Sequence, residues 1–351
     1  MTEPLLHQEI FEQPEVLRHF LKEESAHVGE IARQIRKAGL THAVIAARGT
    51  SDNAATYGRY LLESFVGLPV SLAAPSIYTL YKRPPQLKNA LVIGISQSGE
   101  GVDVNEVVAQ GRAQGAFTLA ITNNASSPMA QSTEHVILCQ AGPEKSVAAT
   151  KTYTSQLYAL AWLGALLGDG TGVRKGQKQA LKALPDQMDQ TLELEKTLSE
   201  RAERYRYAGR FIVVGRGFNY ATAFEIALKL KELTYMVAEP YSSADFRHGP
   251  IAIVEPGFPI LVIAPSGAAF EDMRSLVSQL GERQAELLIV SDQPELLKNA
   301  EIPLPLPVQV EEWVSPLLCV VPGQLLAYHL TLAKGYDPDQ PRTLHKVTVT
   351  R

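Results

Sequence analysis

The sequence contains very little cysteine and no excess of positive charge. Its 351 residues include two cysteines, Cys139 and Cys319, and each lies inside an apolar run. Cysteines placed in this way are usually small core residues, and two of them cannot form the disulfide framework of a small secreted domain. Lys and Arg number 33 against 37 Asp and Glu, which gives a formal net charge of -4. A nucleic-acid-binding protein or a protein of anionic membrane surfaces needs a basic excess, so we expect neither partner.

The sequence also has no recognisable leader or membrane span. Its first residues, MTEPLLHQEIFEQPEV, are acidic and contain no apolar run, so we expect no signal peptide. We find no uninterrupted apolar run near the roughly 20 residues that a transmembrane helix needs. We therefore expect a cytoplasmic protein with no membrane partner.

Patterns that bind metals or dinucleotides are missing as well. The eight histidines are scattered, and no Cys/His pair has the spacing of zinc ligands. Gly215-Arg216-Gly217 begins like a dinucleotide fingerprint, but Tyr220 stands where the third glycine should be. We therefore expect no metal and no cofactor.

Short apolar runs alternate with helical patterns along most of the chain, which is typical of a parallel sheet covered by helices on both faces. The first 38 residues have a helical apolar period, and Pro14 can begin a new helix. In the first half, the pattern predicts strands over 42–47, 70–74, 91–95, 117–122 and 135–139, and helices over 54–65, from 102 onward and over 146–167.

The pattern then restarts after a glycine-rich break and a charged helical stretch over 175–203, which we expect Pro185 to interrupt. The second half predicts strands over 210–214, 258–264 and 286–291, and helices over 221–237, 270–280 and 322–334. Because it repeats the order of the first half about 168 residues later, we infer an internal duplication. The predicted divisions are an N-terminal helical segment (1–38), a first domain (39–168), a linker (169–207), a second domain (208–336) and a C-terminal tail (337–351).

One stretch of the first domain, 91–108, has the pattern of an anion site. An apolar strand ends in Ser96, Gln97 and Ser98, continues through glycines and then begins a helix. The first N–H groups of a helix have no internal partner, and the helix dipole is positive there. The loop has no lysine or arginine, so it would hold one phosphate group with neutral donors. An ordinary strand-to-helix turn with serine as the N-cap is the alternative.

A second stretch, 225–250, combines charged residues at helical spacing with a polar loop. Glu225, Lys229 and Glu232 fall on one narrow face of a helix. The loop that follows ends in His248. A partly desolvated carboxylate here could act as a general base, with the histidine as a proton carrier. A solvated charged face with an ion pair is the alternative.

Several separated motifs, in order over essentially the whole chain, resemble the sugar-isomerase (SIS) family. The chain is similar to the isomerase part of glucosamine-6-phosphate synthases and to the stand-alone deaminases built on the same double fold. The resemblance implies two duplicated SIS domains, each a parallel sheet flanked by helices in a flavodoxin-like three-layer sandwich. It rests on Arg48-Gly49-Thr50-Ser51, Ser96-Gln97-Ser98-Gly99-Glu100, Val147-Ala148-Ala149-Thr150-Lys151, Glu225 to Glu232, Ala238-Glu239, His248-Gly249-Pro250 and Asp339-Gln340-Pro341-Arg342 with Lys346.

The resemblance also implies which residues bind the substrate, a small-molecule sugar phosphate. Gly101 stands where the synthases have a threonine that touches phosphate, so one side-chain donor is absent. Ala149 replaces a serine usual in the synthases. His345 replaces a small residue and could add a proton donor or simply be exposed. The implied phosphate ligands are Thr50, Ser51, Ser96, Gln97 and Ser98, and Glu144 and Val147 would line the sugar hydroxyls.

The catalytic roles follow from the same resemblance. Glu232 would be the base that moves a proton between C1 and C2 of the opened sugar, with Lys229 beside it. His248 would open the sugar ring from the neighbouring subunit, which implies a homodimer. Lys346 in the tail would contact the sugar carbonyl or form an imine with it.

The expected activity is that of a glucosamine-6-phosphate deaminase, which gives fructose 6-phosphate and ammonia. The synthases begin with a glutaminase domain whose nucleophile follows the initiator Met, whereas this chain begins Met1-Thr2-Glu3, so we expect no ammonia release from glutamine. The loop from Ser242 to Pro250 and the motif from Gly215 to Ala221 resemble the deaminases more than the synthases. The alternatives are an isomerase or deglycase of another phosphosugar, an aminotransferase isomerase without its glutaminase, and a phosphosugar-binding regulator.

Overall fold

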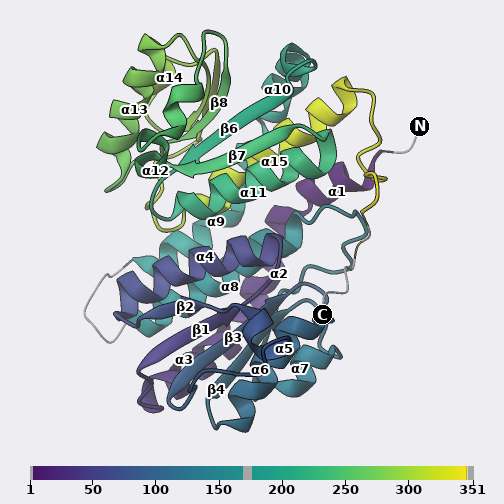
Figure 1. Cartoon of the computed structure of the whole chain (residues 1–351), viewed down its shortest axis with the longest axis vertical. Coiled ribbons are helices and arrows are strands. Elements are labelled where there is room, and N and C mark those ends of the chain that lie inside the picture. The colour runs from purple at the N-terminus through teal and green to yellow at the C-terminus, as the bar shows by residue number, and fades with distance from the viewer. Residues whose placement is uncertain (1–2, 169–175, 345, 347–351) are drawn as a thin grey trace. The chain divides into compact units, whose positions relative to one another are not determined.

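In the computed structural model of the chain, residues 3–168, 176–344 and 346 are described. They form two compact units, which we call unit 1 and unit 2 (Figure 1). Unit 1 consists of the described residues of Met1–Pro14, Lys145–Thr150 and Ala183–Leu344. Unit 2 consists of those of Glu15–Glu144, Lys151–Lys182 and His345–Arg351. Each unit is therefore assembled from segments that are far apart in the sequence.

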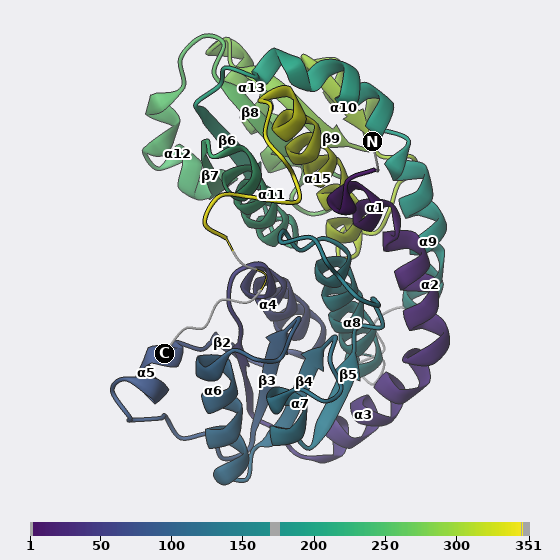
Figure 2. The ribbon, with the colours of Figure 1, turned by 90° about the vertical axis from the view of Figure 1, so that its right-hand side faces the viewer.

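Unit 2 contains a five-stranded sheet in which every neighbouring pair is parallel. Figure 2 shows its strands β3, β4 and β5 side by side. The sheet order is β2-β1-β3-β4-β5, formed by β1 (His42–Ala46), β2 (Val70–Leu72), β3 (Ala90–Ser96), β4 (Phe117–Thr122) and β5 (His135–Leu138).

Helices cover both faces of this sheet. On one face, α5, α6 and α7 pack over a core that includes Val44, Val92 and Ala120. Successive strand residues point to opposite faces, so their neighbours face α3, α4 and α8, which pack against one another. The helices are α2 (Gln13–Glu23), α3 (Ser25–Lys37), α4 (Thr50–Leu61) with the π-helical turn η1 (Leu62–Val66), α5 (Pro75–Thr79), α6 (Val102–Ala113), α7 (Pro128–Ser132) and α8 (Lys151–Gly168).

Unit 1 repeats the architecture. Its sheet order is β10-β9-β8-β6-β7, again with parallel pairs, so its strands follow the same topology as those of unit 2. The predicted duplication of a parallel α/β unit is confirmed. The strands are β6 (Arg210–Gly215), β7 (Val237–Ser242), β8 (Pro259–Ile263), β9 (Glu286–Ser291) and β10 (Ile302–Pro305).

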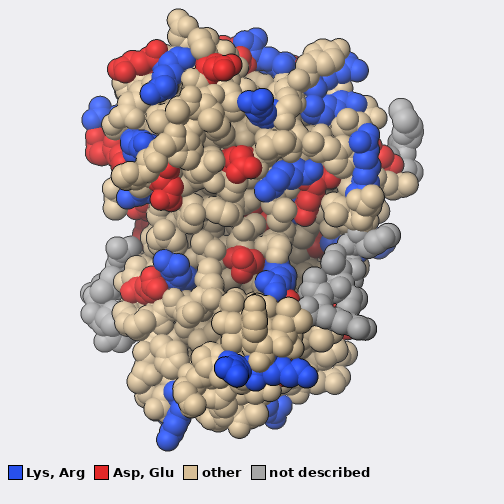
Figure 3. Space-filling view, in the orientation of Figure 1, with Lys and Arg blue, Asp and Glu red and all other residues tan. Residues whose placement is uncertain are grey.

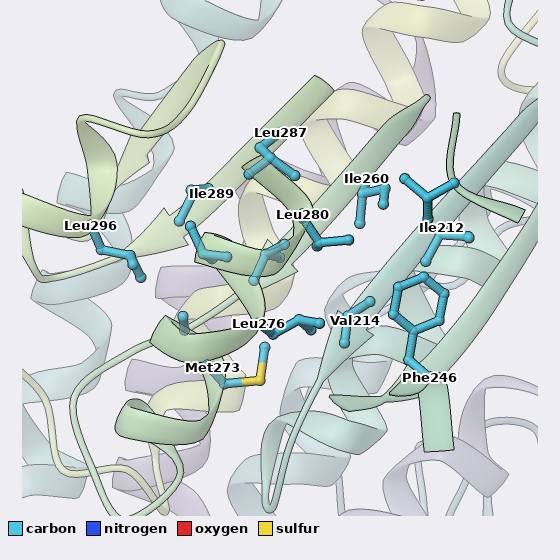
Figure 4. Packing of buried hydrophobic residues seen from close by; sticks show 14 residues of the cluster. Ile212, Val214, Phe246, Ile260, Met273, Leu276, Leu280, Leu287, Ile289 and Leu296 are labelled. Atoms are coloured by element: carbon cyan, nitrogen blue, oxygen red, sulfur yellow. The ribbon is translucent and has the colours of Figure 1, made fainter. Parts of the chain in front are cut away.

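The helices of unit 1 bury their apolar stripes against this sheet and against each other. Figure 4 shows Met273, Leu276 and Leu280 of α13 packed over Ile212, Val214, Ile260 and Ile289 of the strands. On burial, each such side chain contributes roughly 1.5–3 kcal/mol relative to exposure. The helices are α1 (Leu5–Phe11), α10 (Glu195–Arg201) with η3 (Ala202–Tyr205), α11 (Asn219–Thr234), α12 (Ser243–Arg247), η4 (Pro250–Ile253), α13 (Phe270–Glu282), α14 (Pro294–Leu297) and α15 (Ser315–Ala333), and α9 (Gln177–Leu192) has residues in both units.

Prolines led to wrong predictions for both helices and strands. Helix α9 continues through Pro185, and α15 begins at Ser315 and carries Pro322 inside it. An internal proline costs a helix about 3 kcal/mol. The burial of nearly every residue of α15 and of the apolar stripe of α9 offsets that cost.

Two strands were missed for the same reason. Strand β7 contains Pro240 and β10 contains Pro303 and Pro305, which speak against a strand assignment. Both strands lie at an edge of the sheet, where a missing N–H donor is tolerated. The helix predicted over 221–237 therefore ends at Thr234, before β7. The helix predicted from residue 146 begins only at Lys151.

Helix α15 has the length and hydropathy of a membrane-spanning segment, and among the described helices it alone does. Its most apolar window has a mean hydropathy of 1.4, but 83% of that window is buried in the fold, as in a core helix. Pro322, Gln324 and His329 interrupt its apolar run, so the sequence alone does not mark it as a possible span.

Candidate functional site

The predicted phosphate loop of unit 2 lies at the point where the order of the sheet reverses. Strands β1 and β3 are parallel neighbours, so their carboxyl ends meet at one edge of the sheet. Helix α4 leaves β1 toward one face, whereas α6 leaves β3 toward the other. Ligands of open α/β sheets bind at such a switch point. The segments 48–51 and 96–101 meet there.

Hydrogen bonds of its own serines shape the loop. Ser96 Oγ accepts the Gly99 N–H at 3.0 Å, and Ser98 Oγ accepts the Glu100 N–H at 3.3 Å. Gly99 has φ +69°, and a Cβ there would lie 2.2 Å from Ser127 Oγ, so no other residue fits. Ser96, Gln97 and Ser98 are half-buried and therefore remain reachable.

The alternative of serine as an ordinary N-cap is wrong. The N-cap residue of α6 is Gly101, which offers no side-chain cap. The loop serines therefore do not cap the first turn of α6, where Asp103 Oδ1 accepts only the Val104 N–H. This arrangement suits an anion at the helix amino end.

Side chains of other helices support the site in unit 2. Ser51 is buried in the first turn of α4, and its Oγ accepts a hydrogen bond of 3.0 Å from Gln156 Nε2 of α8. Thr50 begins α4 and is half-buried. Gln156 was missed by the sequence analysis because nothing local marks it. Arg48, just after β1, donates from Nε to Asp103 Oδ2 of α6 at 2.7 Å. It thus brings a cation beside a loop that has none of its own.

Lys346 of the tail and Glu144 are brought together in unit 2. The Lys346 Nζ lies 2.7 Å from Glu144 Oε2, and the Glu144 side chain is fully buried. Glu144 also accepts the N–H of Thr152 at 3.1 Å and its hydroxyl at 2.8 Å. The other predicted tail residue, His345, lies outside the described residues.

In unit 1, helix α11 carries the predicted base. Lys229 Nζ lies 2.6 Å from Glu232 Oε2 and 3.4 Å from Glu225 Oε1. Lys229 is 1% exposed and Glu225 0%, whereas the Glu232 side chain is 25% exposed. The alternative of a solvated charged face is therefore wrong. A buried lysine holds one buried carboxylate and one that is accessible.

The segment 145–150 is held by helix α1. The buried carboxylate of Glu9 accepts hydrogen bonds from the backbone N–H groups of Lys145 and Ser146. After Ser146, buried and half-buried residues alternate along the chain, and Val147 and Ala149 are the half-buried ones. These two predicted substrate-lining positions are therefore accessible.

The tail is tied to unit 1 by Asp339 and Arg342 of the motif that precedes Lys346, and by Tyr235. Asp339 accepts the N–H groups of Leu5 and Leu6 at 2.7 and 2.9 Å, which caps α1. The Arg342 guanidinium lies over the ring of Tyr235, 4.5 Å from its centroid. The backbone N–H of Arg342 donates to the Tyr235 hydroxyl at 2.8 Å. Tyr235 directly follows α11, so the tail is anchored beside the helix of Glu232.

His248 is an exposed residue at the carboxyl end of α12. Within unit 1, no hydrogen bond or ion pair joins its side chain to the described residues of α11. Its contribution to the site of a second subunit stays a prediction.

Other charged side chains of the described part form ion pairs away from these residues, among them His7 with Glu195 and Arg204 with Glu286. No group of three or more His, Cys, Asp or Glu side chains there could hold a metal ion. On the face shown in Figure 3, acidic and basic side chains are interspersed. This mixture agrees with the near balance of 33 basic and 37 acidic residues.

Comparisons with known proteins connect both units to one family. The SIS domain model matches residues 34–165 and 205–334. Glutamine–fructose-6-phosphate aminotransferase of Gloeobacter violaceus is 39% identical over 97% of this chain. The match covers 58% of that protein, so the chain spans less than two thirds of its length.

Solved structures share the fold over nearly the whole chain. The C-terminal domain of glucosamine-fructose-6-phosphate aminotransferase from Francisella tularensis has a TM-score of 0.86 at 28% identity, covering 97% of this chain and 98% of that one. A glucosamine-6-phosphate deaminase from Thermotoga maritima has a TM-score of 0.80 at 21% identity, covering 99% and 100%. At that identity the second likeness concerns the fold alone.

Proposed function

The chain belongs to the SIS-domain family, and from this premise we propose that it is a glucosamine-6-phosphate deaminase, which forms fructose 6-phosphate and ammonia. The main support is the pairing of Glu232 with Lys229, a buried lysine, at 2.6 Å. An accessible carboxylate beside a fixed ammonium is suited to proton transfer. The serine loop at the switch point of unit 2 is suited to the phosphate of the same substrate.

The phosphate would fix one end of the sugar. The hydroxyls of Ser51, Ser96 and Ser98 and the amide of Gln97 would donate to its oxygens, together with the first N–H groups of α6. Lys346, paired with Glu144 at 2.7 Å, would face the carbonyl end and stabilise its developing oxyanion. Val147 and Ala149 would line the hydroxyls between these ends.

Glu232 would then carry out the proton transfer. His248 first opens the ring. Glu232 takes the proton from C2 of the opened amino sugar and returns it to C1, so that the aldehyde becomes an alcohol and the amine an imine. Water adds to the imine carbon, ammonia leaves, and the ketone of fructose 6-phosphate remains. We further propose a cytoplasmic homodimer in which His248 serves the site of the second subunit.

A second function is favoured by the relatives. A glutamine–fructose-6-phosphate aminotransferase is 39% identical to this chain, over 58% of its own length. The same site could therefore run in the opposite direction and form an amino sugar phosphate from fructose 6-phosphate. An isomerase or deglycase of another phosphosugar would use the same base.

The test is to incubate the purified chain with glucosamine 6-phosphate and to measure free ammonia and fructose 6-phosphate. We expect both products in equal amounts. No ammonia above an enzyme-free control contradicts the deaminase. Amino sugar phosphate formed readily from fructose 6-phosphate with ammonium, with little ammonia released from glucosamine 6-phosphate, supports the second function instead.

A further inference from the structure

Arg48 lies at the phosphate loop although it belongs to a different strand connection. It follows β1, whose carboxyl end meets that of β3 at the switch point. Its Nε donates at 2.7 Å to Asp103 Oδ2, in the first turn of α6. The guanidinium therefore sits at the amino end of the helix that the loop leads into.

The two terminal nitrogens of the Arg48 guanidinium remain available to a ligand. The ion pair to Asp103 uses Nε, and no described residue accepts a hydrogen bond from either terminal nitrogen of Arg48. The Arg48 side chain is 53% exposed. A guanidinium presents its donors in a rigid fork that matches two oxygens of a phosphate. Arg48 is thus oriented on one side and available on the other.

Asp103 orients Arg48 without using all of its hydrogen-bond donors. Its side chain is 2% exposed, and Oδ1 accepts the Val104 N–H at 2.9 Å. The carboxylate is therefore already stabilised by its own helix amino end. Because the pair is neutral overall, Arg48 would add directed hydrogen bonds more than long-range attraction.

Gly101 carries no side-chain donor, although neither the backbone nor the packing forbids a side chain such as threonine there. Gly101 has φ -61°, and a Cβ there would meet its nearest atom, Asp103 Oδ1, at 3.6 Å. Gly99, in contrast, must be glycine. The fold could therefore hold a side-chain donor at residue 101, and this chain has none there.

We propose that Arg48, oriented by Asp103, is an additional phosphate ligand of this loop and replaces the side-chain donor that Gly101 lacks. The inference rests on the proposed function, since it assumes that a sugar phosphate binds here. It predicts that part of the affinity for the phosphate depends on the guanidinium fork and not on charge alone.

The test measures binding of glucitol 6-phosphate, a sugar phosphate without a carbonyl, to the full chain by calorimetry. Arg48→Met should weaken binding about tenfold to a hundredfold, the range of a hydrogen bond to a charged group. Arg48→Lys keeps the charge but loses the planar fork of donors, so its affinity should lie between those of the wild type and Arg48→Met. The matched control is Arg59→Met, an arginine of α4 paired with Glu63, which should bind like the wild type.

Rescue makes the test specific. Gly101→Thr in the Arg48→Met background should recover several-fold in affinity, because it restores a donor at the same anion. In turnover of glucosamine 6-phosphate, Arg48→Met should raise KM and leave kcat nearly unchanged, which is the signature of a lost binding contact. If Arg48→Met fails to fold, the same calorimetry is carried out with Arg48→Lys and Asp103→Asn. Weaker binding than by the wild type supports the role of Arg48, and equal binding overturns it.

The outcomes separate this inference from the proposed function. If the wild type binds neither glucitol 6-phosphate nor inorganic phosphate, the phosphate site itself fails. If the wild type binds and the Arg48 variants bind equally well, the role of Arg48 is overturned while the proposed function stands.

Discussion

Lys229 lies almost fully buried, with its ammonium 2.6 Å from the accessible carboxylate of Glu232. The same ammonium lies 3.4 Å from Glu225, which is fully buried. Taking charges out of water is costly, so a buried pair of this kind needs both partners in place. The helix therefore holds one carboxylate as a buried counterion and leaves the other accessible, as the proposed base needs.

Glu232→Gln should abolish turnover and preserve binding. The amide has nearly the same shape but cannot take a proton, so kcat should fall by about 10²–10⁴, the usual contribution of a general base. Calorimetry with glucitol 6-phosphate should give an affinity close to that of the wild type. A regulator that only binds phosphosugars would show no functional change, and that result would exclude the catalytic role.

Lys229→Met should destabilise unit 1 as well as stop turnover. It leaves the buried Glu225 without its cation, which costs about 3–5 kcal/mol. The double variant Glu225→Gln/Lys229→Met removes both charges and should recover much of the stability but none of the activity. Urea unfolding and the ammonia assay measure the two effects, and equal losses of both in the double variant would refute the division of roles.

Mixing two inactive variants tests whether His248 serves a second subunit. Glu232→Gln and His248→Ala should each be inactive alone. After unfolding and refolding together at equal amounts, random pairing into twofold dimers leaves one intact site in half of the dimers, or about a quarter of wild-type activity. Activity that stays at background would place His248 and Glu232 of one chain in the same site.

Asp339→Ala should loosen the tail. Its carboxylate accepts the first two N–H groups of α1, and the loss of such a cap costs about 1 kcal/mol, with a range of 0.5–2. Since the tail also carries Lys346, KM for glucosamine 6-phosphate should rise. Thermal unfolding and steady-state kinetics measure both, and unchanged values would show that Asp339 does not hold the tail.

The two cysteines should be inert in the folded chain. Both are fully buried, burial raises the pKa of the Cys139 thiol to about 12, and burial also raises the pKa of Cys319. Reaction needs the thiolate, so a thiol reagent at pH 8 should label neither residue in the native protein and both in urea. Rapid labelling without urea would contradict their place in the core.

Local patterns predicted the parts of the site that lie on single elements. The apolar run of β3, the serines after it and the helix of α6 form one continuous stretch, and the spacing of Glu225, Lys229 and Glu232 follows from one helix. The SIS fold itself could be expected from motifs distributed along the whole chain.

Partners that only the topology brings together could not be predicted. Arg48 and Asp103 are 55 residues apart, and Ser51 and Gln156 are 105 apart. Nothing near Glu9 indicates that it will accept the N–H groups of Lys145 and Ser146. These pairs depend on which strand ends meet and on how helices pack over them. Local pattern carries no information about either.

The central claim is that Glu232 moves a proton from C2 to C1 of a glucosamine phosphate. The most direct measurement follows glucosamine 6-phosphate carrying deuterium at C2, by proton and deuterium NMR, with the wild type and with Glu232→Gln. We predict that the wild type removes the deuterium from C2, releases ammonia and gives fructose 6-phosphate with the label at C1 or in the solvent, while Glu232→Gln leaves the substrate unchanged. Retention of deuterium at C2 by the wild type, or equal loss with both proteins, would contradict the claim.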